Sequence, residues 1–182
     1  THAKVVHIDI DGSELSKTVM ADGGLRADIR MTLEKLLPQI RQVSRPEWQA
    51  KVAELRVLER EYDDARPGLT PKNAVCTLNR FLGENTPVAT DVGQHQMWAA
   101  QYLNFRRSRR FISSGGLGTM GFGMGAAIGA SYGTGEKSVL ITGDGSFGMC
   151  LNELATAVTY GVPLVILLFN NGVLGMVRQW QT

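Results

Sequence analysis

The sequence predicts an α/β protein in which helices flank a parallel sheet. Three observations support this fold class. Beyond residue 70, apolar runs of strand length alternate with segments of helical periodicity, the pattern of consecutive strand–helix–strand units. Residues 138–142 and 163–169 are such runs, and polar, turn-forming residues follow each of them directly. The glycine-rich stretch at residues 115–133 contains small apolar residues that suit a closely packed buried helix.

Before residue 70 the sequence predicts a strand and two helices. Residues 4–10 alternate and then become apolar, as in a mostly buried strand, and a turn with a short helix follows them. Residues 27–37 carry apolar side chains at helical spacing. Residues 46–62 predict a second amphipathic helix, which begins with a proline. Residues 63–70 contain an Arg-Pro-Gly turn, so we expect a linker there.

After residue 70 each element follows from its own local pattern. The expected order is helix 72–82, strand 87–91, helix 94–103, strand 111–113, a helix within 115–133, strand 138–142, helix 152–160 and strand 163–169. Parallel strands joined by helical crossovers place all their carboxyl ends at one edge of the sheet, where open α/β sheets bind ligands. That edge is therefore where the site is expected.

Composition narrows the function classes. The chain has 182 residues, 43% of them hydrophobic, which is ordinary for a globular protein. A formal net charge of +2 is too small to indicate nucleic acid or an anionic membrane surface as a partner. The longest apolar run, at residues 162–169, is far too short to span a bilayer. Cys76 and Cys150 form neither a disulfide framework nor a metal-ligand spacing, so we expect a reducing compartment, most simply the cytoplasm.

Acidic and amide side chains follow two of the predicted strands. Gly143-Asp144-Gly145-Ser146 comes after the first and Asn170-Asn171 after the second. Carboxylate and amide oxygens are ligands that suit Mg²⁺ when a phosphate also binds the ion. Glycines allow a diphosphate to approach the N-terminus of the following helix. The alternative is an ordinary turn with an N-capping aspartate, followed by an Asn-Asn-Gly loop.

Three further segments carry polar or adaptable side chains toward the same edge. Gln94, His95 and Gln96 follow a strand and could hold phosphate oxygens, although a lone histidine is often structural. The glycine-rich loop that contains Met120 could wrap a flat ring, or could serve only helix packing. Residues 174–180 could form a wall for a small anionic substrate, or a helix that packs on a neighbouring subunit.

These segments together resemble a known family. Gly-Asp-Gly followed by Asn-Asn is similar to the metal–cofactor signature of thiamine-diphosphate enzymes. Residues 91–101 (DVGQHQMWAAQ), 114–123 (SGGLGTMGFG) and 174–181 (LGMVRQWQ) resemble more closely the large subunit of the acetohydroxyacid (acetolactate) synthase family. The resemblance covers nearly all of the chain after Thr70. It extends more loosely to residues 7–11, which are similar to the closing strand of that family's FAD-binding central domain.

The resemblance implies an activity, its cofactors and its partners. Pyruvate would lose CO₂ on thiamine diphosphate, with Mg²⁺ bound, and the two-carbon unit would pass to a second 2-keto acid such as 2-ketobutyrate. Acetolactate or acetohydroxybutyrate would result, on the path to branched-chain amino acids. FAD would be a structural cofactor, the full-length chain a homodimer or homotetramer, and a regulatory small subunit a possible partner. A eukaryotic source would imply an organelle instead of the cytoplasm.

The resemblance also assigns roles to individual residues. Asp144, the Asn171 side chain and the Val173 carbonyl would bind Mg²⁺. The residues that would hold thiamine diphosphate are Gln94, His95, Gly118, Met120, Gly143, Gly145, Ser146, Asn171 and Met176. Met176 and Trp180 would lie near the second keto acid, and Asp9, Asp11 and Glu14 near the flavin. In this pattern Gly125 stands where relatives commonly have proline.

The expected domains follow from the same resemblance. Residues 1–30 would end the central, FAD-associated domain, residues 31–69 would form a helical linker, and residues 70–182 would form a diphosphate-binding domain truncated at its C-terminus. Thr1 is not an initiator methionine, and no helix-ending signal closes the sequence, so we expect a piece of a longer polypeptide. The family's activating glutamate belongs to a domain outside these residues. We therefore expect no catalytic residue among these residues, and a fragment that is inactive by itself. The alternatives are a related decarboxylase, oxidase or glyoxylate carboligase, or a non-catalytic phosphate-binding module.

Overall fold

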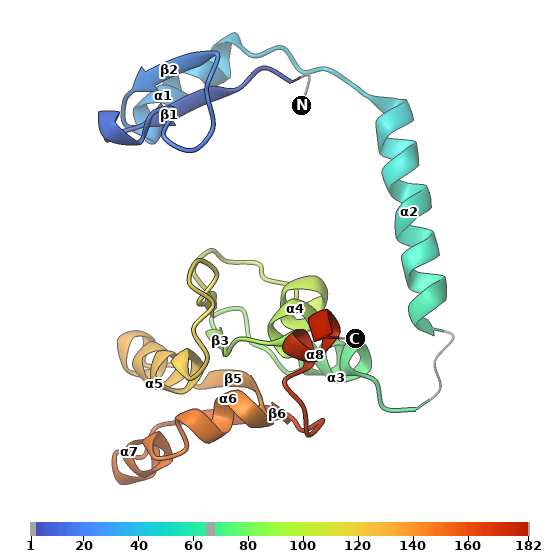
Figure 1. The fold of residues 1–182 in the computed structure, drawn as a ribbon, viewed down its shortest axis with the longest axis vertical. Coiled ribbons are helices and arrows are strands. Elements are labelled where there is room, and N and C mark those ends of the chain that lie inside the picture. The colour runs from blue at the N-terminus through green and yellow to red at the C-terminus, as the bar shows by residue number, and fades with distance from the viewer. Residues whose placement is uncertain (1–2, 65–67, 182) are drawn as a thin grey trace. The chain divides into compact units, whose positions relative to one another are not determined.

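The chain consists of two compact units, Thr1–Val57 and Leu58–Thr182 (Figure 1). The computed structural model describes residues 3–64 and 68–181, and the side chains of residues 3–57 and 68–181. Part of the predicted linker, residues 65–67, lies outside the described residues. The domain boundaries expected after residues 30 and 69 stay predictions.

The first unit contains a two-stranded parallel sheet. β1 (Val6–Asp9) pairs with β2 (Gly23–Arg26), from Val6 opposite Gly23 to Asp9 opposite Arg26. The sequence predicted β1 within residues 4–10. It did not predict β2, because that strand begins with two glycines and glycine is depleted in strands. Between the strands lies the short 3₁₀ helix η1 (Gly12–Glu14), where a turn and a short helix were expected.

Three helical segments complete the first unit and lead out of it. They are α1 (Ile29–Leu36), the 3₁₀ turn η2 (Leu37–Gln39) and α2 (Pro46–Asp64). α1 begins where the Asp28 side chain accepts a hydrogen bond from the Met31 N–H at 3.0 Å. α2 begins with Pro46, at a position where a helix needs no N–H donor. None of residues 3–57 is buried, so the described part of this unit has no core.

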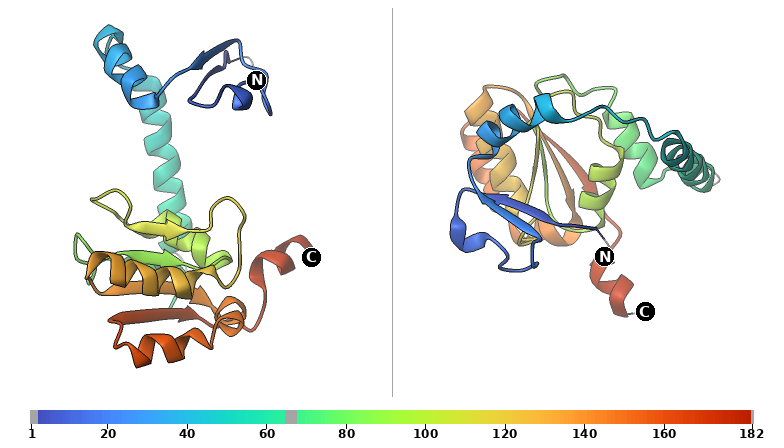
Figure 2. Two further views of the ribbon diagram at one scale, coloured as in Figure 1. Left: turned by 90° about the vertical axis from the view of Figure 1, so that its left-hand side faces the viewer. Right: turned by 90° about the horizontal axis from the view of Figure 1, so that it is seen from above.

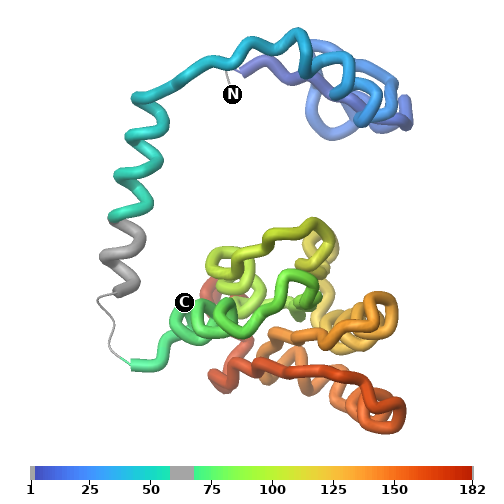
Figure 3. Tube along the Cα trace, turned by 180° about the vertical axis from the view of Figure 1, so that it is seen from behind, coloured from blue at the N-terminus to red at the C-terminus, as the bar shows by residue number. Residues whose placement is uncertain are grey.

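The second unit alternates helices and strands, as the sequence predicted. Its elements are α3 (Pro71–Leu78), β3 (Val88–Thr90), α4 (Gln94–Tyr102), β4 (Phe111–Ser113), α5 (Phe122–Thr134), β5 (Ser138–Gly143), α6 (Asp144–Met149), α7 (Glu153–Thr159), β6 (Leu164–Phe169) and α8 (Gly175–Gln181). The trace of Figure 3 follows this succession from green to red. The predicted α/β fold class is confirmed.

The four strands of this unit form one parallel sheet with the order β4-β3-β5-β6. β5 lies inside the sheet, and all its residues except Gly143 are buried. The connection that leaves β3 runs outward to β4, whereas the one that leaves β5 runs in the opposite direction to β6. The carboxyl ends of β3 and β5 therefore flank a topological switch point, the place where open α/β sheets form a ligand crevice.

Helices cover both faces of this sheet, as the views of Figure 2 show. On one face, Val75 of α3 and Ala99 of α4 pack in a core with Val88, Val139 and Ile141. On the other face, Met124 and Ala127 of α5 and Ala157 of α7 pack with Ala89 and Leu140. Neighbouring residues of one strand serve opposite cores because side chains alternate across a sheet. The result is a three-layer arrangement that holds the strand ends rigidly.

An additional short helix precedes the predicted one. The helix expected at residues 152–160 is confirmed as α7, but the sequence did not predict the short helix α6, which begins at Asp144 itself. α6 ends at Met149, with Cys150 as its C-cap, and α7 begins at Glu153. Asp144 is thus the first helical residue after β5. Of the helices in the described residues, none combines the length and the apolar character needed to cross a membrane.

Candidate cofactor-binding site

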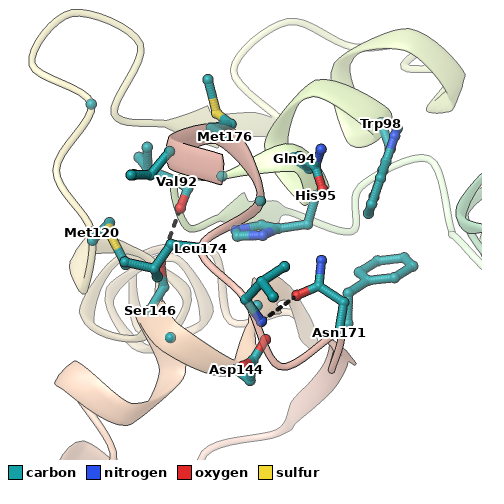
Figure 4. A pocket seen from close by; sticks show the side chains of 18 residues that line it. Val92, Gln94, His95, Trp98, Met120, Asp144, Ser146, Asn171, Leu174 and Met176 are labelled. Atoms are coloured by element: carbon teal, nitrogen blue, oxygen red, sulfur yellow. Dashed lines mark hydrogen bonds between the residues drawn. The ribbon is translucent and has the colours of Figure 1, made fainter. Parts of the chain in front are cut away.

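A cavity of about 270 Å³ lies at the switch point of the sheet (Figure 4). Its lining comes from the segments that follow β3, β5 and β6, from the glycine-rich loop before α5 and from the start of α8. The lining residues are Val92, Gly93, Gln94, His95, Trp98, Gly118, Met120, Gly143, Asp144, Gly145, Ser146, Phe169, Asn171, Val173, Leu174, Gly175, Met176 and Val177. The cavity thus joins segments that are far apart in the sequence.

The end of β5 brings Asp144 and Ser146 to the cavity. Asp144 opens α6, where a carboxylate is stabilised by the free N–H groups of a helix N-terminus. Ser146 is buried, and its hydroxyl donates to the Val92 carbonyl at 3.0 Å. This bond ties α6 to the loop after β3. Asp144 is partly exposed, so its carboxylate is accessible to a ligand.

Two glycines of the β5–α6 turn stand where side chains would collide. A Cβ added at Gly143 would lie 2.9 Å from His95 Nδ1, and one added at Gly145 would lie 2.6 Å from Leu174 Cδ2. Neither glycine has a positive φ, so here close approach, not backbone conformation, requires glycine. The turn is therefore shaped to bring His95 and Leu174 against the strand end.

The end of β6 contributes Asn171. The Asn171 side-chain oxygen accepts from the Val173 N–H at 3.2 Å, an Asx turn, and Gly172 between them has a φ of 66°. Figure 4 shows this hydrogen bond at the side of the cavity where Asp144 also lies. Asp144, Asn171 and Val173 all line the cavity, so the three predicted metal ligands are brought together.

Among the side chains of residues 3–57 and 68–181, no group of three His, Cys, Asp or Glu residues could hold a metal. An ion at Asp144 would have one carboxylate from this part of the chain. Its remaining ligands would have to be neutral amide or carbonyl oxygens, water, or the oxygens of a bound anion. This is the ligand pattern of Mg²⁺ held jointly by protein and phosphate.

His95 is the buried polar group of the cavity. Its side chain is only 5% exposed, and its Nε2 has no hydrogen-bond partner. Burial lowers the pKa of His95 below its ordinary 6.5, while the charges of Asp91 and Asp144 and a main-chain hydrogen bond of Asp91 oppose that shift. The imidazole is therefore neutral at pH 7. An unpartnered buried nitrogen that lines a cavity is a group suited to a ligand.

The loop that leads into α5 supplies Gly118 and Met120. Gly118 has a φ of 63°, its N–H donates to the Ser114 carbonyl at 3.1 Å, and Ser114 Oγ accepts from the Thr119 N–H at 3.1 Å. These bonds shape the loop into a turn that faces the cavity. The positive φ explains the glycine at position 118, because other residues rarely adopt it.

Not every predicted residue of the second unit lines this cavity. Met176 lines it, but Trp180 does not, and the Trp180 side chain is 88% exposed. The three acidic residues expected near a flavin, Asp9, Asp11 and Glu14, belong to the first unit. There Asp9 accepts from the Asp11 N–H, Asp11 caps η1, and Glu14 pairs with Lys17.

The sequence missed part of the apolar wall. Trp98 of α4 and Phe169 at the end of β6 line the cavity and meet edge to face, with ring centroids 5.4 Å apart. Leu174 lies over Gly145, and the Gln94 side chain lies against Gly175. Phe169 ends a predicted strand and Leu174 follows it closely, so the sequence indicated that both lie near the site. No local pattern indicates that Trp98 faces Phe169.

The fold and the cavity define an α/β domain with a ligand crevice at the carboxyl edge of a parallel sheet. Residues 91–182 match the family described as "Thiamine pyrophosphate enzyme, C-terminal TPP binding domain". The chain belongs to this family. The match begins at the first residue after β3 and includes every residue predicted to bind thiamine diphosphate or metal.

Individual relatives show more narrowly which proteins the chain is similar to. The chain is 42% identical over 189 residues to the acetolactate synthase isozyme 3 large subunit of Escherichia coli, covering 99% of this chain and 33% of that protein. It is 40% identical to acetolactate synthase 1, chloroplastic, of Nicotiana tabacum, covering 100% and 28%. A probable acetolactate synthase large subunit of Methanocaldococcus jannaschii is 42% identical, with coverage of 98% and 32%. The predicted resemblance is confirmed, and the chain spans about a third of the length of these relatives.

Proposed function

We propose that this chain supplies the diphosphate- and Mg²⁺-binding part of a thiamine-diphosphate-dependent acetolactate synthase. The complete enzyme would join the two-carbon unit of pyruvate, after loss of CO₂, to a second 2-keto acid such as pyruvate or 2-ketobutyrate. The observation that supports this most directly is the convergence, on one cavity at the switch point, of the segments after β3, β5 and β6 with the glycine-rich loop before α5. Acetolactate synthases as relatives over nearly the whole chain support the substrate class.

The residues of the cavity fit thiamine diphosphate and Mg²⁺. Asp144, the Asn171 side chain and the Val173 carbonyl would hold the ion, because one carboxylate with neutral oxygens leaves positive charge for the diphosphate. Gln94, His95, Gly145 and Ser146 would face the diphosphate, together with Gly143 of the strand end. The buried Nε2 of His95, which lacks a partner, is a nitrogen that such a ligand would satisfy.

The glycine-rich loop would hold the ring part of the cofactor. The Gly118 carbonyl would accept from an aminopyrimidine, and Met120 would support a bent cofactor with its adaptable side chain. When bound, thiamine diphosphate supplies an electron sink for decarboxylation. This chain's own contribution is to bind, orient and exclude water through the apolar wall of Trp98, Phe169 and Leu174.

Acceptor choice and assembly are further parts of the proposal. Met176, which lines the cavity, and Trp180 would contact the second keto acid. Asp9, Asp11 and Glu14 would lie near a structural FAD. The complete chain would form a homodimer or homotetramer with a regulatory small subunit; some relatives are named as large subunits, which supports a subunit of that kind.

Cofactor binding by the 182-residue chain tests the proposal directly. Titration calorimetry with thiamine diphosphate should give binding with Mg²⁺ present and none with EDTA. Asn171→Ala should weaken binding by about tenfold or more, since octahedral Mg²⁺ tolerates loss of a ligand poorly. Asn170→Ala is the matched control, because the neighbouring amide does not line the cavity, and it should leave the dissociation constant unchanged. Equal effects of the two changes would exclude the proposed metal site.

Product analysis tests the substrate class. A longer polypeptide that includes these residues should convert pyruvate to acetolactate, whereas acetaldehyde, acetyl phosphate or the glyoxylate-derived product would indicate another thiamine-diphosphate enzyme. The 182-residue chain alone should form no acetolactate. Cofactor binding that persists undiminished in Asn171→Ala and without Mg²⁺ would instead indicate a non-catalytic phosphate-binding module.

A further inference from the structure

Asp91 is a fully buried carboxylate directly behind the cavity. It follows β3, its side chain is 0% exposed, and it is not among the residues that line the cavity. A buried charge costs free energy unless hydrogen bonds satisfy it. Its partners therefore indicate what it does.

The partners of Asp91 belong to three different segments. Its Oδ1 accepts from the Gly121 N–H at 2.7 Å and from its neighbour's N–H, that of Val92, at 3.1 Å. Its Oδ2 accepts from the Thr142 hydroxyl of β5 at 3.5 Å. One side chain thus links the end of β3, the end of β5 and the start of α5. The shortest of these bonds crosses 30 positions of sequence.

The bond to Gly121 acts at the beginning of a helix that has no cap of its own. Gly121 is the N-cap of the 13-residue helix α5, has a φ of 87°, and can offer no side-chain oxygen. The Asp91 carboxylate accepts a hydrogen bond from the N-cap N–H, the bond that the N3 glutamate makes in a capping box. Its negative charge also complements the helix dipole. Gly123 permits this approach, since a Cβ there would lie 2.8 Å from the Asp91 nitrogen.

Gly121 also ends the loop that carries Gly118 and Met120 to the cavity. The loop is held at its other end by the Ser114 main chain and hydroxyl, and its last N–H is held by Asp91. We propose that Asp91 is a positioning residue, which fixes the Gly118–Met120 wall of the cavity against the ends of β3 and β5. Its effect on cofactor affinity rests on the proposed function, whereas its effect on the loop does not.

Asp91→Ala tests the loop in the complete 182-residue chain without cofactor. Removal of a hydrogen bond to a charged group should raise amide hydrogen exchange at residues 118–121 by about tenfold or more. The dissociation constant of thiamine diphosphate, measured with Mg²⁺, should rise by a similar factor. Unchanged exchange at these residues would overturn the proposal.

Asp91→Asn is the conservative variant and covers the case in which Asp91→Ala does not fold. The amide keeps an oxygen that can accept from Gly121 but loses the charge that about doubles the strength of such a bond. We expect a parental circular dichroism spectrum with exchange at residues 118–121 raised about threefold. Exchange equal to that of the parent chain would contradict the role of the carboxylate.

Ser131→Ala separates positioning from plain helix stability. Ser131 is buried near the other end of α5, where its hydroxyl donates to the Glu136 carbonyl at 2.9 Å. This variant should destabilise α5 without changing loop exchange or cofactor affinity. If Ser131→Ala reproduced both effects of Asp91→Ala, Asp91 would have only a structural role in α5. If the parent chain bound no thiamine diphosphate, the proposed function would fail, while the exchange result would still decide the role of Asp91.

Discussion

The two units of this chain differ in how their secondary structure is stabilised. In Leu58–Thr182, cores on both faces of a four-stranded sheet contain fully buried residues such as Leu140 and Ile141. In Thr1–Val57, no described residue is buried, and apolar helix residues such as Ile29 and Leu33 stay exposed. Local caps and one pair of strands hold that unit. Helical periodicity therefore predicts helices in both units, but among the described residues only the second unit forms a core.

The largest difference in stability between the two units should come from leucine-to-alanine substitutions. Leu140→Ala removes a fully buried side chain from β5 and should lower the free energy of unfolding by about 2–5 kcal/mol, since it leaves a cavity. Leu33→Ala in α1 should change it by less than about 0.5 kcal/mol, because Leu33 is 42% exposed. Urea unfolding followed by hydrogen-exchange mass spectrometry reports each unit separately. A large loss from Leu33→Ala would show that the first unit has a core after all.

Glycine-to-alanine substitutions should give a second, smaller difference in stability between the two units. A Cβ at Gly123 would lie 2.7 Å from Leu140 Cδ1 and 2.8 Å from the Asp91 nitrogen. Overpacking costs about 1–3 kcal/mol and alanine's helix propensity recovers about 1 kcal/mol, so Gly123→Ala should destabilise by up to about 2 kcal/mol. Gly23→Ala in β2 meets nothing within 4 Å and should be neutral or slightly stabilising. The same thermal or urea unfolding experiment measures both.

Gly125→Ala is the control within α5. Nothing lies within 4 Å of a Cβ at this exposed position, so alanine should stabilise the helix by up to about 1 kcal/mol. Destabilisation by Gly125→Ala would show that α5 resists substitution for a reason other than contact with Asp91 and Leu140.

Acid should lower the stability of the two units in different pH ranges. We expect these effects to be smaller than those of the leucine and glycine substitutions. The pKa of buried His95 is lowered from 6.5, so its neutral form is favoured on folding. Its contribution is complete above pH 6.5 and is lost as pH falls below that value, with a slope of at most about 1.4 kcal/mol per pH unit. Asp11 in the first unit has a pKa lowered from 3.8 by hydrogen bonds from Ser13, so its contribution is lost only below pH 3.8.

Unfolding of each unit measured from pH 7 to below pH 3.8 checks these two ranges. His95→Gln should flatten the dependence of the second unit, and Asp11→Asn should leave it unchanged. A dependence that persists in His95→Gln would assign the titration to another group.

Much of the fold was accessible to sequence reasoning. The strands at residues 138–142 and 163–169 were predicted nearly in full because apolar β-branched runs bounded by glycine or asparagine are a local signal. β2 was missed because Gly23 and Gly24 have weak strand propensity, and its pairing with β1 comes from the partner strand. The short helix α6 was not predicted because Gly145 and Gly148 have weak helix propensity, so residues 143–146 indicate a turn.

Residue order and local chemistry determined the alternation of elements, the polar groups at the strand ends and the family to which the chain belongs. Tertiary packing decided the strand order β4-β3-β5-β6, the burial of His95 Nε2 without a partner and the placement of Leu174 over Gly145. It also decided that Asp91 binds a helix start 30 positions away. Periodicity and turn residues act over a few neighbouring positions, whereas close contacts between distant segments depend on how whole layers pack.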